Sequence, residues 1–76
     1  PGVLVGAIRN AKDSAQLEQS LREKQITHLM LREDLLTGFL SNNLAADQAR
    51  LWNDFATSRL RLNFREHGYA VYELNG

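Results

Sequence analysis

A continuous apolar run near the middle of the chain limits its fold more than any other feature. Residues 26–31 read Ile-Thr-His-Leu-Met-Leu and carry apolar side chains that point to both sides of an extended chain. A short run of this kind is typical of a strand that is buried on both faces. We therefore predict a central strand over residues 26–31, with Leu29 and Leu31 in the core.

The last third of the chain predicts an antiparallel hairpin. Residues 60–65 alternate between apolar and basic or polar side chains, and residues 69–74 are again strand-like. The His-Gly pair at 67–68 suits a two-residue turn, because glycine readily adopts positive φ. The alternative is a helix that continues from the preceding segment, since Leu60 and Phe64 are also four residues apart.

The first third predicts a strand followed by a helix. Residues 3–8 form a short apolar run rich in β-branched residues, which is typical of a buried strand of the parallel type. Asp13 is the expected N-cap of a helix over residues 14–24, and Gln16 stands three residues later, as in a capping box. The helix is amphipathic, because its leucines recur four residues apart.

Two more helices are expected between the central strand and the hairpin. Asp34 can cap a helix over residues 35–40, which the Ser-Asn-Asn sequence after it should stop. A further helix over residues 46–57 should turn Trp52 and Phe55 toward the core.

These elements predict a small α/β domain that spans residues 1–76, in the order β-α-β-α-α-β-β. The first strand, helix and second strand form a βαβ unit, whose strands should be parallel and whose crossover should be right-handed. With the antiparallel C-terminal hairpin, the domain becomes a two-layer or three-layer sandwich. A chain of 76 residues has room for only one such core.

Composition excludes several functional classes. Nine basic residues balance nine acidic ones, so the electrostatic attraction that drives nucleic-acid binding is not implied and no nucleic-acid partner is expected. The chain has no cysteine, which excludes disulfides and thiolate metal sites. No apolar run approaches the roughly 20 residues that span a bilayer.

The strongest candidates for a polar site are Glu33 and Asp34, which follow the carboxyl end of the second predicted strand. Ligands bind at that end of open α/β sheets, and two adjacent carboxylates there suit a metal or a sugar hydroxyl. We favour the simpler interpretation that Asp34 caps the next helix. Arg61 and Arg65, together with Arg59, share the outer face of the third predicted strand. They suit an anion or lipid-headgroup patch, or a charged face that discourages edge-to-edge strand pairing.

Neither histidine is expected to be catalytic, because His28 should be a partly buried structural residue and His67 a solvated turn residue. His28 lies within a strand, without a second histidine nearby in sequence, and His67 lies in the predicted turn. Gly6 is a single glycine inside the first apolar run, so a phosphate-binding loop is not indicated. We therefore expect no catalytic, cofactor-binding or metal-binding residues.

Two segments resemble a known family. Residues 21–31, Leu-Arg-Glu-Lys-Gln-Ile-Thr-His-Leu-Met-Leu, are similar to a stretch near the end of many bacterial polytopic membrane glycosyltransferases. These enzymes are of the dolichyl-phosphate-mannose-protein mannosyltransferase type and have the GT-C architecture. Residues 60–74 resemble the closing hairpin of the same proteins. Gln25 stands where the family often has a helix-ending glycine.

The resemblance implies a C-terminal domain on the extracytoplasmic, periplasmic face of the bacterial inner membrane. The chain starts at Pro1 without a methionine, so we expect a piece of a longer membrane protein. The family's catalytic carboxylate lies in a membrane-domain loop that nothing here matches. The expected role is to assist acceptor binding or stability, with the parent's membrane portion as partner and with a lipid-linked sugar or acceptor bound by the parent.

Two other functions stay open. The first is a stand-alone interaction module that dimerises through an exposed strand or an apolar face. The second is a small enzyme that uses His28, Glu33 and Asp34. The enzyme requires that these three side chains converge on one pocket.

Overall fold

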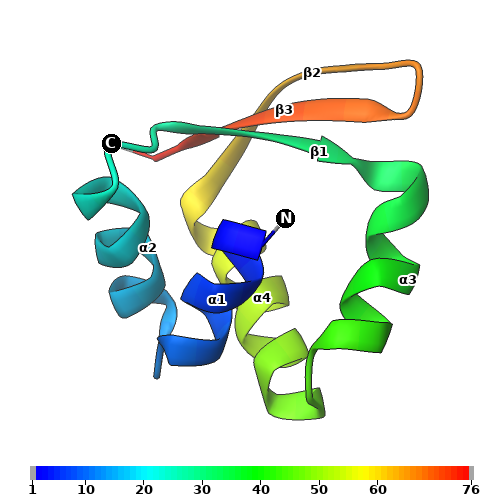
Figure 1. The fold of residues 1–76 in the computed structure, drawn as a ribbon. Coiled ribbons are helices and arrows are strands. Elements are labelled where there is room, and N and C mark those ends of the chain that lie inside the picture. The colour runs from blue at the N-terminus through cyan, green and yellow to red at the C-terminus, as the bar shows by residue number, and fades with distance from the viewer. Residues whose placement is uncertain (1, 76) are drawn as a thin grey trace.

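In the computed structural model, which describes residues 2–75, helices pack beneath a three-stranded sheet (Figure 1). The elements are α1 (Gly2–Asn10), α2 (Ser14–Glu23), β1 (His28–Arg32), α3 (Glu33–Asn43), α4 (Ala46–Arg59), β2 (Leu60–Glu66) and β3 (Tyr69–Leu74). The α/β class is confirmed, with two layers. The expected element order is wrong at its start, because the chain begins with two helices.

The sheet has the strand order β1-β3-β2, and both pairs of strands are antiparallel. The predicted parallel βαβ unit is therefore wrong. The predicted position of residues 26–31 is also wrong, because β1 is an edge strand and β3 occupies the centre. Leu29 and Leu31 are half-buried as a result, and alanine at either position should cost less than in a fully enclosed strand.

The apolar run at residues 3–8 is a helix and not the expected strand. Leu4, Ala7 and Ile8 lie three or four residues apart and are all buried in the core, whereas Val3 is exposed. A short apolar run fits a strand and a buried helix equally well by periodicity. The neighbouring α2 and α4 decide the outcome, because α1 packs against both of them.

The N-terminus of α2 agrees closely with the sequence. The Asp13 side chain accepts a hydrogen bond from the Gln16 backbone N–H at 2.8 Å, which confirms the N-cap. The Gln16 side chain accepts from the Lys12 N–H, one residue earlier than in a regular capping box. The bond to Asp13 satisfies a backbone donor that the first turn of α2 would otherwise leave free.

The C-terminus of α2 is a Schellman motif built on Gln25. The Ile26 N–H bonds to the Leu21 carbonyl, and the Gln25 N–H bonds to the Arg22 carbonyl. Gln25 has φ 61°, in the left-handed region that favours glycine. The motif turns the chain out of the helix and into β1 within a few residues.

Asp34 is not the cap of α3. The N-cap is Arg32, which makes no side-chain capping bond, and Asp34 lies inside the first turn. The helix also continues through residues 41–43, where the sequence predicted its end. α4 is two residues longer than predicted. Its start is stabilised by the Gln48 side chain, which accepts from the Ala45 N–H at 2.8 Å.

The core lies between the sheet and helices α1, α2 and α4. Phe55 is completely buried and Trp52 nearly so, with ring centroids 5.9 Å apart, which confirms the predicted inward face of α4. The remaining large members of this cluster come from the other two helices and from the strands: Leu4, Ile8, Leu17, Leu21, Leu60 and Leu74.

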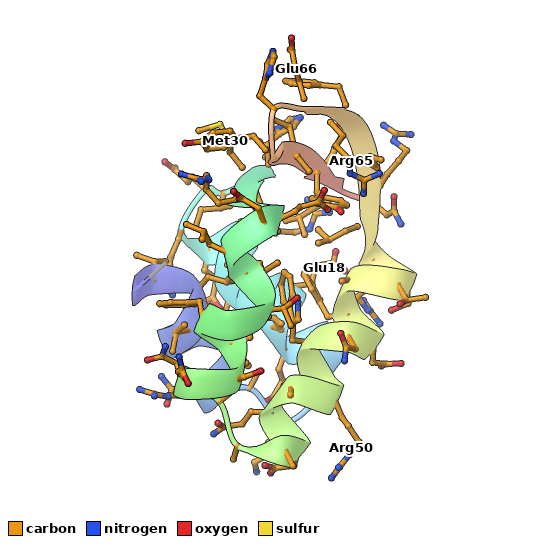
Figure 2. All side chains as sticks on the ribbon, turned by 90° about the vertical axis from the view of Figure 1, so that its right-hand side faces the viewer. Glu18, Met30, Arg50, Arg65 and Glu66 are labelled. Carbon is orange, nitrogen blue, oxygen red and sulfur yellow. The ribbon has the colours of Figure 1, made fainter. Side chains whose placement is uncertain are left out.

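The predicted hairpin is confirmed, with a β-bulge that the sequence did not reveal. Leu62 pairs with Tyr72 and Phe64 with Val71, so Asn63 is an extra residue in β2. One extra residue moves every later side chain to the opposite face of the sheet. Phe64 therefore lies on the outer face, and Arg65 turns toward the helices. Figure 2 shows the next residue, Glu66, at the top of the sheet, away from the helix layer.

Candidate binding groove along strand β1

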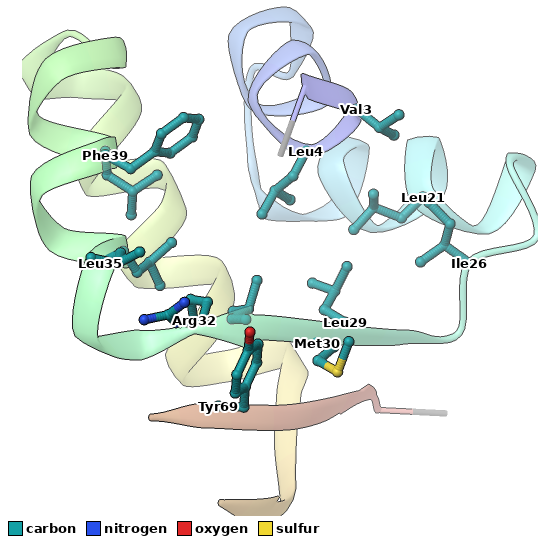
Figure 3. A pocket seen from close by; sticks show the side chains of 13 residues that line it. Val3, Leu4, Leu21, Ile26, Leu29, Met30, Arg32, Leu35, Phe39 and Tyr69 are labelled. Atoms are coloured by element: carbon teal, nitrogen blue, oxygen red, sulfur yellow. The ribbon is translucent and has the colours of Figure 1, made fainter. Parts of the chain in front are cut away.

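An apolar groove with a volume of about 460 Å³ lies beneath β1. Figure 3 shows Leu29 on its floor, Val3 and Leu4 on one wall, and Leu35 and Phe39 on the other. Its lining is apolar except at the rim, where Arg32 and the Tyr69 hydroxyl lie. Such a surface binds partners through apolar burial rather than through charge.

The two walls are helices α1 and α3, which both run away from the sheet (Figure 1). The Arg9 guanidinium of α1 donates to the Asn43 carbonyl at the end of α3, with an N–O distance of 2.6 Å. This bond places a cation at a helix C-terminus, where the helix dipole favours it. The bond therefore joins the two walls at the ends that lie farthest from the sheet.

Several groove residues are far more exposed than their chemistry favours. The exposed fraction is 57% for Leu35 and 56% for Val3 on the groove walls, and 71% for Met30, whose side chain lies at the edge of the groove on the outer face of β1. α3 has no fully buried residue at all, although its sequence carries an apolar stripe. An apolar helix face that the rest of the protein leaves largely exposed is typical of a protein-interaction surface.

The sequence did not predict this groove. Met30 was expected in a central strand and Val3 in another buried strand, where both would be covered. One signal was available: Leu35 and Phe39, and Leu36 and Leu40, are two four-residue pairs that make the apolar stripe of α3 unusually wide.

The free edge of β1 runs along the mouth of the groove. At the two ends of its pairing with β3, the Leu74 N–H bonds to the Thr27 carbonyl and the Glu33 N–H to the Gly68 carbonyl. Because bonded pairs alternate along an antiparallel ladder, the backbone groups of Leu29 and Leu31 face β3. Those of His28, Met30 and Arg32 therefore point out of the sheet.

The predicted polar residues lie outside the groove and do not form one site. Glu33, at the start of α3, is bonded by both Arg65 and the Tyr72 hydroxyl, the latter at 2.5 Å. The bulge at Asn63 makes this cluster, since Arg65 would otherwise point away from α3. The cluster ties the helix to the sheet. Arg65 is therefore not on the outer basic face that the sequence predicted.

The bonds from Arg65 and then from Tyr72 hold the pKa of Glu33 below its usual value. The same carboxylate raises the pKa of Tyr72. The bonds that Glu33 accepts favour its ionised form, and the same carboxylate favours the protonated, neutral form of the Tyr72 phenol.

We expect this cluster to make the protein less stable in acid. A carboxyl whose pKa is depressed by folding stabilises the protein above its unfolded pKa, about 4.3 for glutamate, and that contribution is lost as the pH falls through the folded value. The urea midpoint should drop between about pH 5 and pH 3. Glu33→Gln should make this drop smaller, because glutamine does not titrate.

Glu23→Gln is the matched control, because it removes an exposed carboxylate of α2. It should leave the acid-induced drop in the urea midpoint unchanged. An equal drop in the Glu33→Gln protein and the unmodified protein would show that the cluster contributes nothing.

Asp34 and Arg61 take part in two separate ion pairs. Asp34 binds Arg32 through two hydrogen bonds of 3.0 and 2.7 Å, which lower the pKa of this carboxyl, and the Arg32 guanidinium also lies 5.2 Å from the centre of the Tyr69 ring. Arg61 pairs with Glu73 across the outer face of the sheet. Exposed pairs of this kind contribute little to stability.

The histidines are both exposed. His67 occupies the hairpin turn, with φ 51°, as the sequence predicted. His28 was expected to be partly buried, but its side chain lies on the surface, with Nε2 3.8 Å from Glu73. His28 begins the five-residue β1, and Glu33 and Asp34 follow its other end. At the usual rise of a strand, the backbone of Glu33 lies about 16 Å from that of His28. The three side chains that an enzyme would need are not brought together.

Within residues 2–75 we find no cluster of three or more histidine or acidic side chains that could hold a metal ion. No helix in the same part of the chain has the length and apolar character needed to cross a membrane.

Comparison of the chain with models of known protein families, with curated protein sequences and with solved structures finds no match.

Proposed function

We propose that this chain is a non-catalytic protein-binding domain, and that an extended apolar segment binds in the groove along β1. The observation that carries this proposal is the apolar groove that lies directly beside an open strand edge. A strand edge offers hydrogen bonds to any extended backbone, and pockets beside it select alternate side chains. Neither the groove nor the open edge alone indicates a binding mode. Together they match recognition of a peptide by strand addition.

We also propose a setting for this domain. The resemblance of residues 21–31 and 60–74 supports a domain on the periplasmic face of the bacterial inner membrane, within a polytopic mannosyltransferase-like glycosyltransferase. There it would assist acceptor binding or the stability of its parent. The membrane portion of the parent would bind the lipid-linked sugar and carry out the transfer.

The proposal predicts which peptides the purified chain selects. Peptides chosen from a random library should be extended and apolar, and they should shift the backbone amide resonances of His28, Met30 and Arg32. Leu35→Glu places a charge on the groove wall and should weaken their binding by roughly tenfold or more, because the charge loses its water when the peptide covers it. The same preparation should not turn over a polyprenyl-phosphate sugar.

Phe64→Glu is the matched control, because Phe64 is equally exposed but lies on β2, outside the groove. It should leave peptide binding unchanged. Peptides that shift resonances away from β1 would contradict the binding site, and turnover of the sugar would contradict the non-catalytic role.

A further inference from the structure

We propose that the segment bound along β1 is β1 of a second copy of this chain, so that two three-stranded sheets join into one. This inference rests on the proposed function, because it names the partner of the same edge and groove. Four features of the described residues support a second copy: the positions of the free backbone groups, the inner face, the outer face and the contrast between the two sheet edges.

The free backbone groups of β1 are placed for pairing with themselves. His28, Met30 and Arg32 direct these groups out of the sheet, and Met30 is the central residue of the strand. A two-fold axis through Met30 pairs His28 with the partner's Arg32 and Met30 with the partner's Met30. The residues that exchange hydrogen bonds in this register are therefore those with free backbone groups, as an antiparallel ladder requires.

The inner face of this pairing is apolar. The same register places Leu29 opposite the partner's Leu31, in the pairs whose side chains lie closest together. Both leucines are only half-buried in the single chain and face the groove. Pairing therefore covers apolar surface on both copies at once, and it does so without bringing a charge into the groove.

The outer face continues two rows of side chains from one sheet into the other. Met30 lies beside Val71 and Phe64 in an exposed apolar row, which the partner's Met30 extends. The second row carries Arg61, Glu73 and His28, and the partner's Arg32 follows next to His28. Glu73 lies between Arg61 and His28, and each Arg32 is already paired with Asp34. The row therefore brings no unpaired positive charges against each other.

The opposite edge of the sheet lacks these features. β2 carries a bulge at Asn63 and the largely exposed Arg61, which are two devices that keep sheet edges from pairing. β1 is straight, uninterrupted and beside the groove (Figures 1 and 3). The contrast assigns the pairing to β1 and limits the assembly to two copies, because each copy has only one open edge.

A cysteine at position 30 tests the register directly. The chain has no cysteine, so Met30→Cys introduces a single thiol. Across a two-fold axis the two Cα atoms would lie about 5.5 Å apart, within the range that a disulfide spans. We expect mild oxidation to give a covalent dimer. Phe64→Cys, on the same face but on the other edge strand, should give no covalent dimer under the same conditions.

Charge substitutions test the association without covalent bonds. In sedimentation, the unmodified chain should change from monomer to dimer as its concentration rises. Met30→Glu and Met30→Lys should each weaken the dimer by roughly tenfold or more, because like charges face each other at the axis. An equal mixture of the two variants should restore it. Phe64→Lys is the control and should leave the dimer intact.

The outcomes separate this inference from the proposed function. A chain that stays monomeric but binds apolar peptides at β1 overturns the second copy and leaves the binding domain standing. A monomer that binds no peptide overturns both. A dimer that survives Met30→Glu, or that forms a disulfide more readily at position 64, overturns the pairing through β1.

Discussion

Replacing Phe55 with alanine should unfold most of the protein at room temperature. Phe55 is completely buried, and its ring packs against that of Trp52 at the centre of the core. Truncation of a buried phenylalanine to alanine costs about 3–5 kcal/mol, because the lost transfer energy adds to the energy of the cavity. A domain of this size has only about 3–5 kcal/mol of net stability to lose. Circular dichroism during urea unfolding measures the effect.

Phe64→Ala is the control for this substitution. Phe64 is 55% exposed on the outer face of the sheet, so its removal leaves no cavity and should shift the urea midpoint only slightly. Equal losses of stability in the two variants would show that α4 does not turn its aromatic face toward the core.

Replacing Ile8 with alanine should cost about 2–5 kcal/mol, the range for a buried isoleucine. Ile8 has no exposed surface, and it lies one helical turn after Leu4 on the face of α1 that packs against α2 and α4. This is the largest effect that we expect within residues 2–10. Chemical denaturation of the variant and the unmodified chain gives the difference directly.

Two further substitutions distinguish the helix from the strand that the sequence predicted there. Val3→Ala should be nearly neutral, since Val3 is exposed, whereas a buried strand would need it in the core. Gly6→Ala should stabilise the protein by about 0.5–1 kcal/mol, because alanine is favoured inside a helix and its Cβ would have no heavy atom within 4 Å. Destabilisation by both changes would favour the strand.

The sequence by itself determined the elements whose causes are local. Asp13 caps α2 because a short acidic side chain reaches the N–H three residues later, whatever packs around it. The hairpin turn forms at His67 and Gly68, both at positive φ, because glycine adopts that conformation without strain. Trp52 and Phe55 face inward because their helical spacing places them on one side of α4.

The tertiary structure decided every feature that depends on contacts between distant residues. Residues 3–8 suit a strand or a helix alone, and the packing of α1 against α2 and α4 selects the helix. The pairing of β1 with β3 made β1 an antiparallel edge strand. The bulge at Asn63 then reversed the faces of Phe64 and Arg65. The groove follows from the packing of α1 and from the edge position of β1, because an apolar pattern in the sequence shows which residues avoid water but not which neighbours cover them.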